Sequence, residues 1–450
     1  MKITVLGQAA DVEVIRELLS PWNVSFTSFD QAEVAIVYNK KYLETKKTIV
    51  IPSDSSDFMK WIKDIKSRVM KKPGERVFVA TTSQKVLTFT PQILYSYDGL
   101  VKSAFEETPP TAAALNEDLV FLTLDIIKEY NKILDETLNA KSSTLYNVFT
   151  GLPVPYTLAP KQLRDLFMRE HRVQENLTLC DKLPLDALRF ILVKAIEKLT
   201  NKKLHKKTWN GKKYACLITH DVDTKDGLLR SVTVKKLEEK YDVPSAWYLP
   251  SAQYPLDQEI VAALTNNGEV GSHDTKHDGR LYRLSGKKLA DRLSHSKKIL
   301  EKMVGGPVAG FRAPLLQHNS DILSNLKDCG YQYDSSIPTW EVKHPRTMRS
   351  HGIGTVFPTR IEGMKELPIT IMQDHQLLHV LDCTPKEAIE TWLSNIAVIK
   401  ELGGSCVLLS HPEYNLLDTQ GLPLYEELLN TIAFDREMLV GLPNKICDIK

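Results

Sequence analysis

Two carboxylates lie one residue apart at the end of an apolar run, and their types and spacing suggest chemistry. The run is 215–219, and the carboxylates are Asp221 and Asp223. In a strand, residues two apart face the same side, so these side chains can enter one pocket. His220 should then face the opposite side as a packing residue. Because catalytic groups of α/β proteins gather at the carboxyl ends of strands, we expect a functional site here.

Residues that can bind metals or move protons follow later apolar runs. His273 and His277 are four residues apart, and a helical turn between them would let both bind one metal ion. Arg312 ends another run and can brace a carboxylate through a two-point contact. His411 ends a further run and can serve as a general acid. Each of these residues taken alone has an ordinary alternative, such as a surface arginine or a capping histidine.

Three more positions belong to this set or compete with it. Asp334 lies in Tyr-Asp-Ser-Ser, and Trp340 follows it by six residues. A second histidine pair, His375 and His379, has the same spacing as the first. No strand-like run and glycine precede it directly, so we interpret it as a pair of surface or core histidines.

The composition describes an ordinary globular protein. The chain has 450 residues, which favours two or three domains, with 42% hydrophobic and 25% charged residues. Its 58 Lys and Arg balance 56 Asp and Glu, so no strong field attracts nucleic acid. We find no secretory signal or apolar stretch that could span a membrane, and the six cysteines show no CxxC pairing. We expect a cytoplasmic protein with free thiols.

The elements that must position these residues indicate three segments. Residues 1–107 predict a small α/β accessory domain with strands over 3–6, 34–38 and 48–51, a helix from Ser53 through Ile65, and a hairpin of 77–80 with 86–89. Residues 108–211 predict a mostly helical connector with helices over 117–139 and 185–199. Residues 212–450 alternate strand-like and helical runs, which is typical of a parallel α/β barrel or open sheet.

The order of the motifs in this last segment resembles the polysaccharide deacetylase family, also called carbohydrate esterase family four. The resemblance covers residues 212–415 or so and departs from the family's usual pattern at several positions. Thr-His-Asp-Val-Asp at 219–223 resembles a branch with an Asp-x-Asp motif, which includes peptidoglycan deacetylases and ureide-cleaving relatives. Asp274 replaces a Ser or Thr, Leu315 replaces a Tyr, and the spacing from Asp334 to Trp340 is loosened.

The resemblance implies a distorted (β/α) barrel and a division of roles. Asp223, His273 and His277 would hold a divalent metal, with Zn²⁺ expected. For the proton transfers, Asp221 would be the base and His411 the acid that protonates the leaving amine. Positioning would come from Arg312, which steers Asp221, and from Asp334, which orients His411. Trp340 would offer a flat face to a sugar ring or lie in the core.

The function implied is a metal-dependent hydrolase that cleaves a carbon–nitrogen bond other than a peptide bond. The expected reaction is deacetylation of an N-acetylated sugar or glycan precursor. One alternative is a cytoplasmic amidohydrolase that acts on a small ureide, cyclic imide or formamide. The other is a catalytically inactive protein that binds metal or carbohydrate.

Overall fold

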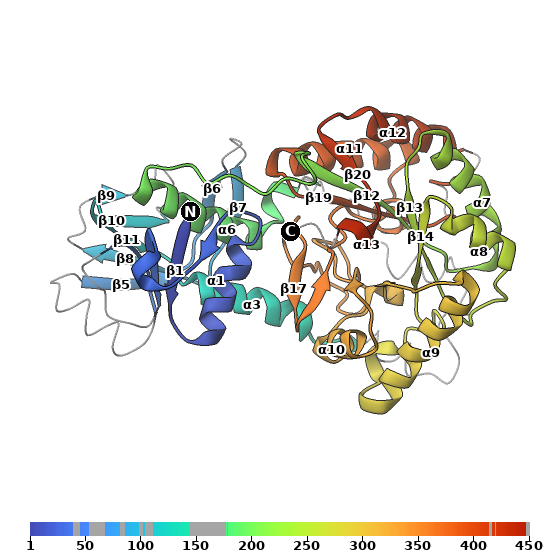
Figure 1. Ribbon diagram of the computed structural model, residues 1–450, viewed down its shortest axis with the longest axis horizontal. Helices are drawn as coiled ribbons and strands as arrows, with labels where there is room; N and C mark the ends of the chain where they lie inside the picture. Colours follow the sequence, from blue (N-terminus) through green and yellow to red (C-terminus); the bar gives the residue numbers. More distant parts are fainter. Residues whose placement is uncertain are drawn as a thin grey trace. The chain divides into compact units, whose positions relative to one another are not determined.

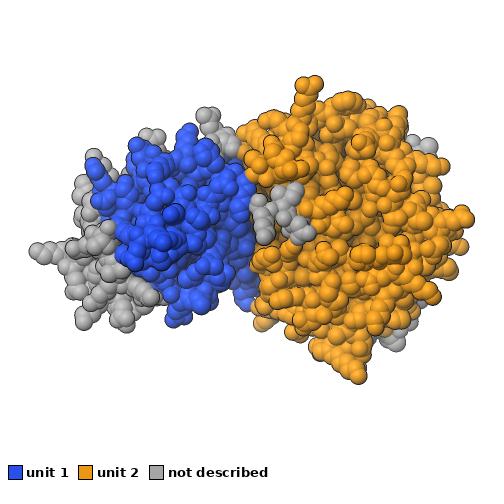
Figure 2. Space-filling view, viewed as in Figure 1, with its two compact units in different colours: residues 1–135, 180–207 blue, residues 136–179, 208–450 orange. Residues whose placement is uncertain are grey.

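The computed structural model describes most of the chain as two compact units. The described residues are 1–38, 46–53, 68–81, 86–98, 102–103, 111–144, 147, 177, 179–413, 416–418 and 420–446. The helix expected from Ser53 through Ile65 lies outside them. Unit 1 is Met1–Asp135 with Cys180–Lys207, and unit 2 is Glu136–Leu179 with Thr208–Lys450 (Figure 2). The three-segment division stays a prediction, and the units share out the segment 108–211.

Unit 1 contains a seven-stranded sheet in the order β2-β1-β3-β4-β11-β10-β9. Its strands are β1 (Lys2–Leu6), β2 (Ser25–Phe26), β3 (Val34–Tyr38), β4 (Lys47–Ile51), β9 (Lys102–Ser103), β10 (Ala112–Asn116) and β11 (Leu119–Leu122). Two further pairs are antiparallel, β5 (Arg68–Pro73) with β8 (Ile93–Asp98) and β6 (Val77–Ala80) with β7 (Val86–Phe89). The strands expected at 3–6, 34–38 and 48–51 and the hairpin are therefore present.

Helices of unit 1 follow the predicted apolar periodicity, with one difference. α1 (Ala9–Leu19) and α6 (Pro184–Thr200) contact each other, and the face of α1 that carries Ile15, Leu18 and Leu19 is fully buried. α3 (Ile126–Leu138) begins later than the helix expected over 117–139. All four residues of β11 are buried, and such a run lacks the alternation that would separate a strand from a helix.

Unit 2 is built on a nine-stranded sheet in the order β17-β18-β16-β15-β14-β13-β12-β19, with β20 also paired to β12. The strands are β12 (Tyr214–Asp221), β13 (Ser245–Leu249), β14 (Gly268–Ser272), β15 (Gly310–Phe311), β16 (Tyr333–Asp334), β17 (Thr359–Ile361), β18 (Met364–Glu366), β19 (Ser405–Ser410) and β20 (Met438–Val440). All pairs except β17–β18 are parallel. The Ile371 amide donates to the Val407 carbonyl of β19 at 3.4 Å, so the segment after β18 meets the far end of the sheet. The parallel strands with intervening helices agree with the expected (β/α) architecture, and the strand pairing leaves the barrel open.

Helices surround this sheet on its outside (Figure 1). They are α7 (Lys225–Lys240), α8 (Gln258–Thr265), α9 (Gly286–Val304), α10 (Ser320–Asp328), α11 (Pro385–Leu402) and α12 (Leu422–Phe434). Four of them begin at a side-chain cap, from Thr224, Asp257, Asn319 and Thr384. Among the described residues, none of the helices combines the length and apolarity needed to cross a bilayer.

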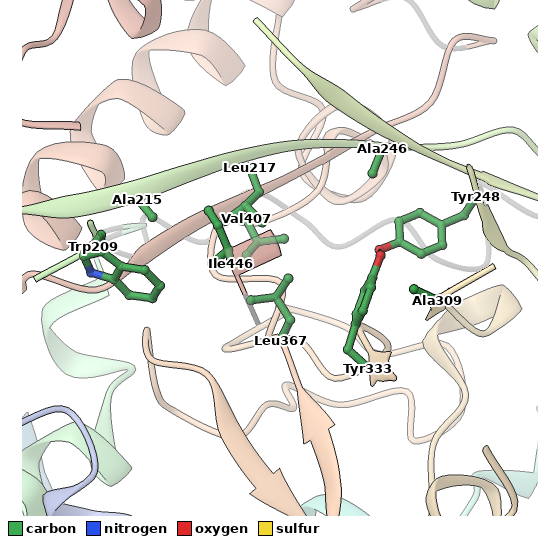
Figure 3. Packing of buried hydrophobic residues seen from close by; sticks show 10 residues of the cluster. All are labelled: Trp209, Ala215, Leu217, Ala246, Tyr248, Ala309, Tyr333, Leu367, Val407 and Ile446. Atoms are coloured by element: carbon green, nitrogen blue, oxygen red, sulfur yellow. The ribbon is translucent and has the colours of Figure 1, made fainter. Parts of the chain in front are cut away.

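The interior of the sheet holds an apolar cluster that sets the direction of the site residues. Ala215 and Leu217 of β12 and Tyr248 of β13 point into this cluster (Figure 3). Because side chains alternate along a strand, Thr219 and Asp221 continue the same inward face. The short helix α13 (Pro443–Ile446) adds Ile446 to the cluster. The apolar cluster therefore ends where the polar residues of β12 begin.

Candidate metal centre

Asp221 ends β12 and is held by a buried arginine. Arg312 follows β15, and its Nη1 donates to Asp221 Oδ1 at 3.1 Å and to Thr219 Oγ1 at 2.8 Å. Its Nε donates to the Ser335 carbonyl at 2.8 Å, and the guanidinium carbon lies 4.2 Å from the centre of the Tyr248 ring. The predicted contact between Arg312 and a carboxylate is therefore present, and the arginine is fixed on several sides.

Asp223, His273 and His277 converge beside Asp221. Asp223 Oδ1 lies 3.2 Å from His273 Nε2, and Asp223 Oδ2 lies 3.4 Å from His277 Nε2. One ligand atom of each residue lies within 4.8 Å of the other two. Asp221 Oδ2 is farther from His273 Nε2, at 3.9 Å. The structure thus separates the two carboxylates of the Asp-x-Asp motif, one within the cluster and one at its edge.

The donor set fits a divalent metal ion such as Zn²⁺. Tetrahedral bonds of about 2.0–2.2 Å place neighbouring ligand atoms about 3.3–3.6 Å apart, close to the separations seen. Asp223 Oδ1 and His273 Nε2 are buried and have no hydrogen-bond partner other than each other. His273 Nδ1 lies 2.8 Å from the Arg312 carbonyl, which can only accept, so the proton is on Nδ1 and the Nε2 lone pair faces the cluster.

Electrostatics favour the metal-binding forms of Asp223 and His277, whereas at His273 they favour the protonated imidazole. Burial opposes charge on Asp223, but His277 and His273 outweigh it and lower the pKa of Asp223. Burial lowers the pKa of His277 and keeps this imidazole neutral. For His273 burial is outweighed by Asp221 and Asp223, which raise its pKa, so protons compete with a metal at this residue.

His411 follows β19, and a carboxylate that the sequence did not single out holds it. Its Nδ1 lies 2.7 Å from Asp374 Oδ1, and its amide donates to Asp374 Oδ2 at 2.8 Å. Burial opposes charge on the imidazole, but Asp374, Asp223 and Asp221 outweigh it and raise the pKa of His411 to about 10. Asp374 comes one residue after the apolar stretch 367–372, as Asp221 comes one residue after the run 215–219.

Asp334 occupies a different place from the one expected. It accepts hydrogen bonds from Ser336 Oγ at 2.6 Å and Ser336 N at 3.3 Å, and its carboxyl shares a hydrogen bond with Glu366. The contact with His411 belongs to Asp374. The role assigned to Asp334 is therefore corrected: a loosened motif spacing led to the wrong acidic residue. Trp340 is partly buried.

The segment that carries both metal-type histidines is clamped from α9. Arg292 donates to both oxygens of Asp274, at 2.6 Å to Oδ2 from Nη2. It also donates to Asp278, at 2.9 Å to Oδ1. Asp274 is buried and has a positive φ of 63°, a conformation that costs energy for a residue other than glycine. One arginine thus fixes the residues that follow His273 and His277.

Glu413 lies beside the metal-type aspartate and was also not predicted. The Asp223 amide donates to Glu413 Oε1 at 3.0 Å. Burial and the nearby Asp223 charge raise the pKa of Glu413 to about 8. A Cβ at Gly227 would lie 2.3 Å from Glu413 Oε2, so this glycine makes room for the carboxyl group. Glu413 therefore fixes the backbone of Asp223.

The remaining histidines of the sequence prediction are not part of the cluster of Asp223, His273 and His277. His220 is buried on the outer face of β12, where it stacks on Trp247 and its Nε2 lies 2.7 Å from Glu238 Oε1. His375 and His379 lie at a π-helical turn with ring centres 5.5 Å apart. They are not among the possible metal-binding groups found in the described residues.

Residues 214–333 match the model of a family described as polysaccharide deacetylase. Among solved structures, a protein named as a polysaccharide deacetylase from Mycobacterium smegmatis is similar, with 19% identity over 53% of this chain and 90% of that chain and a TM-score of 0.45. An allantoinase is 11% identical over 53% of this chain and 90% of that chain, with a TM-score of 0.41. A second protein named as a polysaccharide deacetylase, from Pseudomonas aeruginosa PAO1, is 10% identical over 53% of this chain and 91% of that chain, with a TM-score of 0.39.

No curated protein matches the chain significantly. The family match covers the elements from β12 to β16, which carry Asp221, Asp223, His273, His277 and Arg312. Asp374 and His411 lie beyond it. Residues 214–333 thus match the polysaccharide deacetylase family in sequence.

Proposed function

We propose that unit 2 is a metal-dependent hydrolase that removes the acetyl group from an N-acetylated sugar or glycan precursor. The observation that carries this proposal is the convergence of Asp223, His273 and His277 beside a carboxylate held by an arginine. A divalent ion bound there, expected to be zinc, would polarise the amide carbonyl and lower the pKa of water.

Asp221 is the proposed general base. Arg312 occupies its Oδ1, and Oδ2 lies on the side of the metal-type cluster, 3.9 Å from His273 Nε2. The guanidinium holds the carboxylate in position, and Oδ2 can accept a proton from the attacking water. Burial of the pair strengthens this interaction relative to one in water.

His411 is the proposed general acid. Its Nδ1 faces Asp374, so the proton for the leaving amine comes from Nε2. Asp374 raises the pKa of His411 and so favours the protonated imidazole, as an acid must be before the carbon–nitrogen bond breaks. Asp374 is then a positioning residue that acts through His411.

The test combines metal content with a panel of amides. Purified protein is assayed for bound metal and for acetate released from N-acetylated sugar oligomers, beside Asp221→Asn and His273→Ala. We expect Asp221→Asn to keep the metal and lose activity, and His273→Ala to lose both. A wild-type protein that binds no metal and releases no acyl group from any amide would overturn the proposal.

The same panel addresses the second candidate, an amidohydrolase that acts on small ureides, cyclic imides or formamides. The Asp-x-Asp motif at 221–223 is the observation that favours it. If the protein releases formate or ammonia from such compounds and no acetate from sugars, its substrate belongs to this class and is not an N-acetylated sugar. The cytoplasmic location stays a prediction.

A further inference from the structure

A second group of imidazoles lies in unit 2 outside the proposed catalytic residues. His318 follows the short helix η5 (Pro314–Leu316), and His344 and His351 lie in the irregular segment between β16 and β17. His318 and His344 are fully buried, and His351 is partly buried. One nitrogen of each ring lies within 4.8 Å of the other two. The fold thus brings together three potential ligands from two separate loops.

The Leu316 carbonyl determines which nitrogen of two rings carries a proton. His318 Nδ1 lies 2.7 Å from this oxygen, and His344 Nε2 lies 3.2 Å from it. Because a carbonyl only accepts, the proton sits on these nitrogens and the other nitrogen of each ring keeps its lone pair. His273 and the Arg312 carbonyl show the same arrangement at the first cluster. Such backbone contacts commonly orient histidines that bind metals.

The nitrogens that keep lone pairs contact His351 and the Arg346 amide, and the His318 ring also contacts the Thr137 carbonyl. His318 Nε2 lies 2.9 Å from His351 Nε2, so these atoms either share one proton or bind the same ion. His344 Nδ1 accepts a long hydrogen bond of 3.2 Å from the Arg346 amide. The tetrahedral separation of about 3.3–3.6 Å requires the first pair to move apart by roughly half an ångström.

The surroundings keep the rings neutral. Burial lowers the pKa of His318 and His344, and it lowers the pKa of His351 to about 4, with Arg346 adding to each shift. The Arg346 guanidinium itself donates from its two terminal nitrogens to the Ala140 and Thr137 carbonyls and lies over the Tyr282 ring, whereas its Nε is buried without a hydrogen-bond partner. Neutral imidazole is the form that binds transition metals.

We propose that His318, His344 and His351 form a second metal site, which binds a divalent transition ion of the Zn²⁺ class. Partly exposed His351 leaves one side open for water as a further ligand. The site would tie the segment around 344–351 to the turn that follows Arg312. That turn holds Leu315 and Leu316 at positive φ of 56° and 50°, a strained backbone that needs a brace.

The experiment counts zinc in the full-length chain. Protein stripped with chelator, loaded with Zn²⁺ and desalted is analysed for metal per chain by mass spectrometry. We expect two ions in the wild type and one in His318→Ala. A double variant, Asp223→Ala with His277→Ala, should also hold one ion, and the combination of all three changes should hold none. His295→Ala, which changes an exposed histidine on α9, is the matched control and should keep two.

X-ray absorption on the Asp223→Ala, His277→Ala double variant identifies the ligands of the remaining ion. The spectrum of this double variant should show scattering from imidazole rings, and this scattering should disappear when His351→Gln is added. This result supports the site even if His318→Ala does not fold. A wild type with a single ion, absent from the double variant, overturns the second site and leaves the proposed function intact. A wild type whose single ion survives in the double variant instead contradicts the metal centre of the proposed function.

Discussion

Replacing Asp374 by asparagine should lower the pKa of His411 with little change of shape. The change keeps the size of the side chain and removes its charge. Asp374 contacts His411 through both oxygens, at 2.7 Å to Nδ1 and 2.8 Å to the backbone amide. A hydrogen bond to a charged group contributes roughly 1.5–3 kcal/mol, and one pKa unit corresponds to about 1.4 kcal/mol. The pKa of His411, about 10 in the wild type, should fall by about 1–2 units.

The assay is a nuclear magnetic resonance titration of the ¹³C-labelled histidine rings in metal-free protein, with the His411 signal assigned by its absence in His411→Gln. Metal-free protein is needed because a cation at Asp223 opposes charge on His411. Asp328→Asn, the same chemical change at an exposed residue, is the control and should leave the titration unchanged. A wild-type His411 that titrates near 6.5, or an Asp374→Asn variant with the wild-type value, would refute the reasoning.

Three further predictions concern the clamp, a buried acid and the core. Arg292→Ala should weaken zinc binding by about 10–100-fold, and Arg292→Lys should restore part of the affinity, as measured by chelator competition. An unchanged affinity in Arg292→Ala would show that Arg292 does not position the zinc ligands. Burial raises the pKa of Glu269 to about 7. Between about pH 4.5 and 7 the folded state therefore binds a proton that the unfolded state has released. The stability that this proton provides is complete at low pH and is lost as pH rises through 7. In the wild type, the free energy of unfolding measured with urea should fall by roughly 3 kcal/mol between pH 4.5 and 8, and Glu269→Gln should abolish this fall. An equal fall in the wild type and the variant would contradict the prediction. Gly310→Ala places a Cβ 2.1 Å from the ring of Tyr333 and should lower the free energy of unfolding, measured by thermal unfolding, by about 1–3 kcal/mol. A Cβ at Gly306 meets no atom within 4 Å, so Gly306→Ala is the control, and an equal loss in both variants would contradict the prediction.

The strand-end residues of the site could be predicted from the sequence, because each follows a strand of one parallel sheet. This rule brings together Asp221, His273, Arg312 and His411, which lie far apart in the chain. It works because the carboxyl ends of parallel strands meet at one edge, whatever the loops between them do.

The missed residues lie where no such rule applies. Asp374 follows a stretch that belongs to no strand and is held by an isolated bridge between Ile369 and Pro338 and by the hydrogen bond from Ile371 to Val407. Its contact with His411 spans 37 residues. Asp334 was chosen by spacing within a motif, and spacing says nothing of which carboxylate faces a given imidazole. Long-range contacts of this kind depend on tertiary packing, which periodicity does not encode.

The three-histidine cluster shows the same limit more strongly. His318 and His344 come from irregular segments with residues at positive φ, and their meeting point is a backbone carbonyl. Neither the spacing nor the flanking residues give a signal for it.

The most direct test of the central claim is acetate release from N-acetylated sugar oligomers by zinc-loaded wild-type protein and by Asp221→Asn. The account predicts release by the wild type, loss with chelator, recovery with zinc, and an Asp221→Asn variant that binds the metal but releases at least 100-fold less acetate, as expected for removal of a general base. Release that is unaffected by chelator, or equal in the variant, would contradict it.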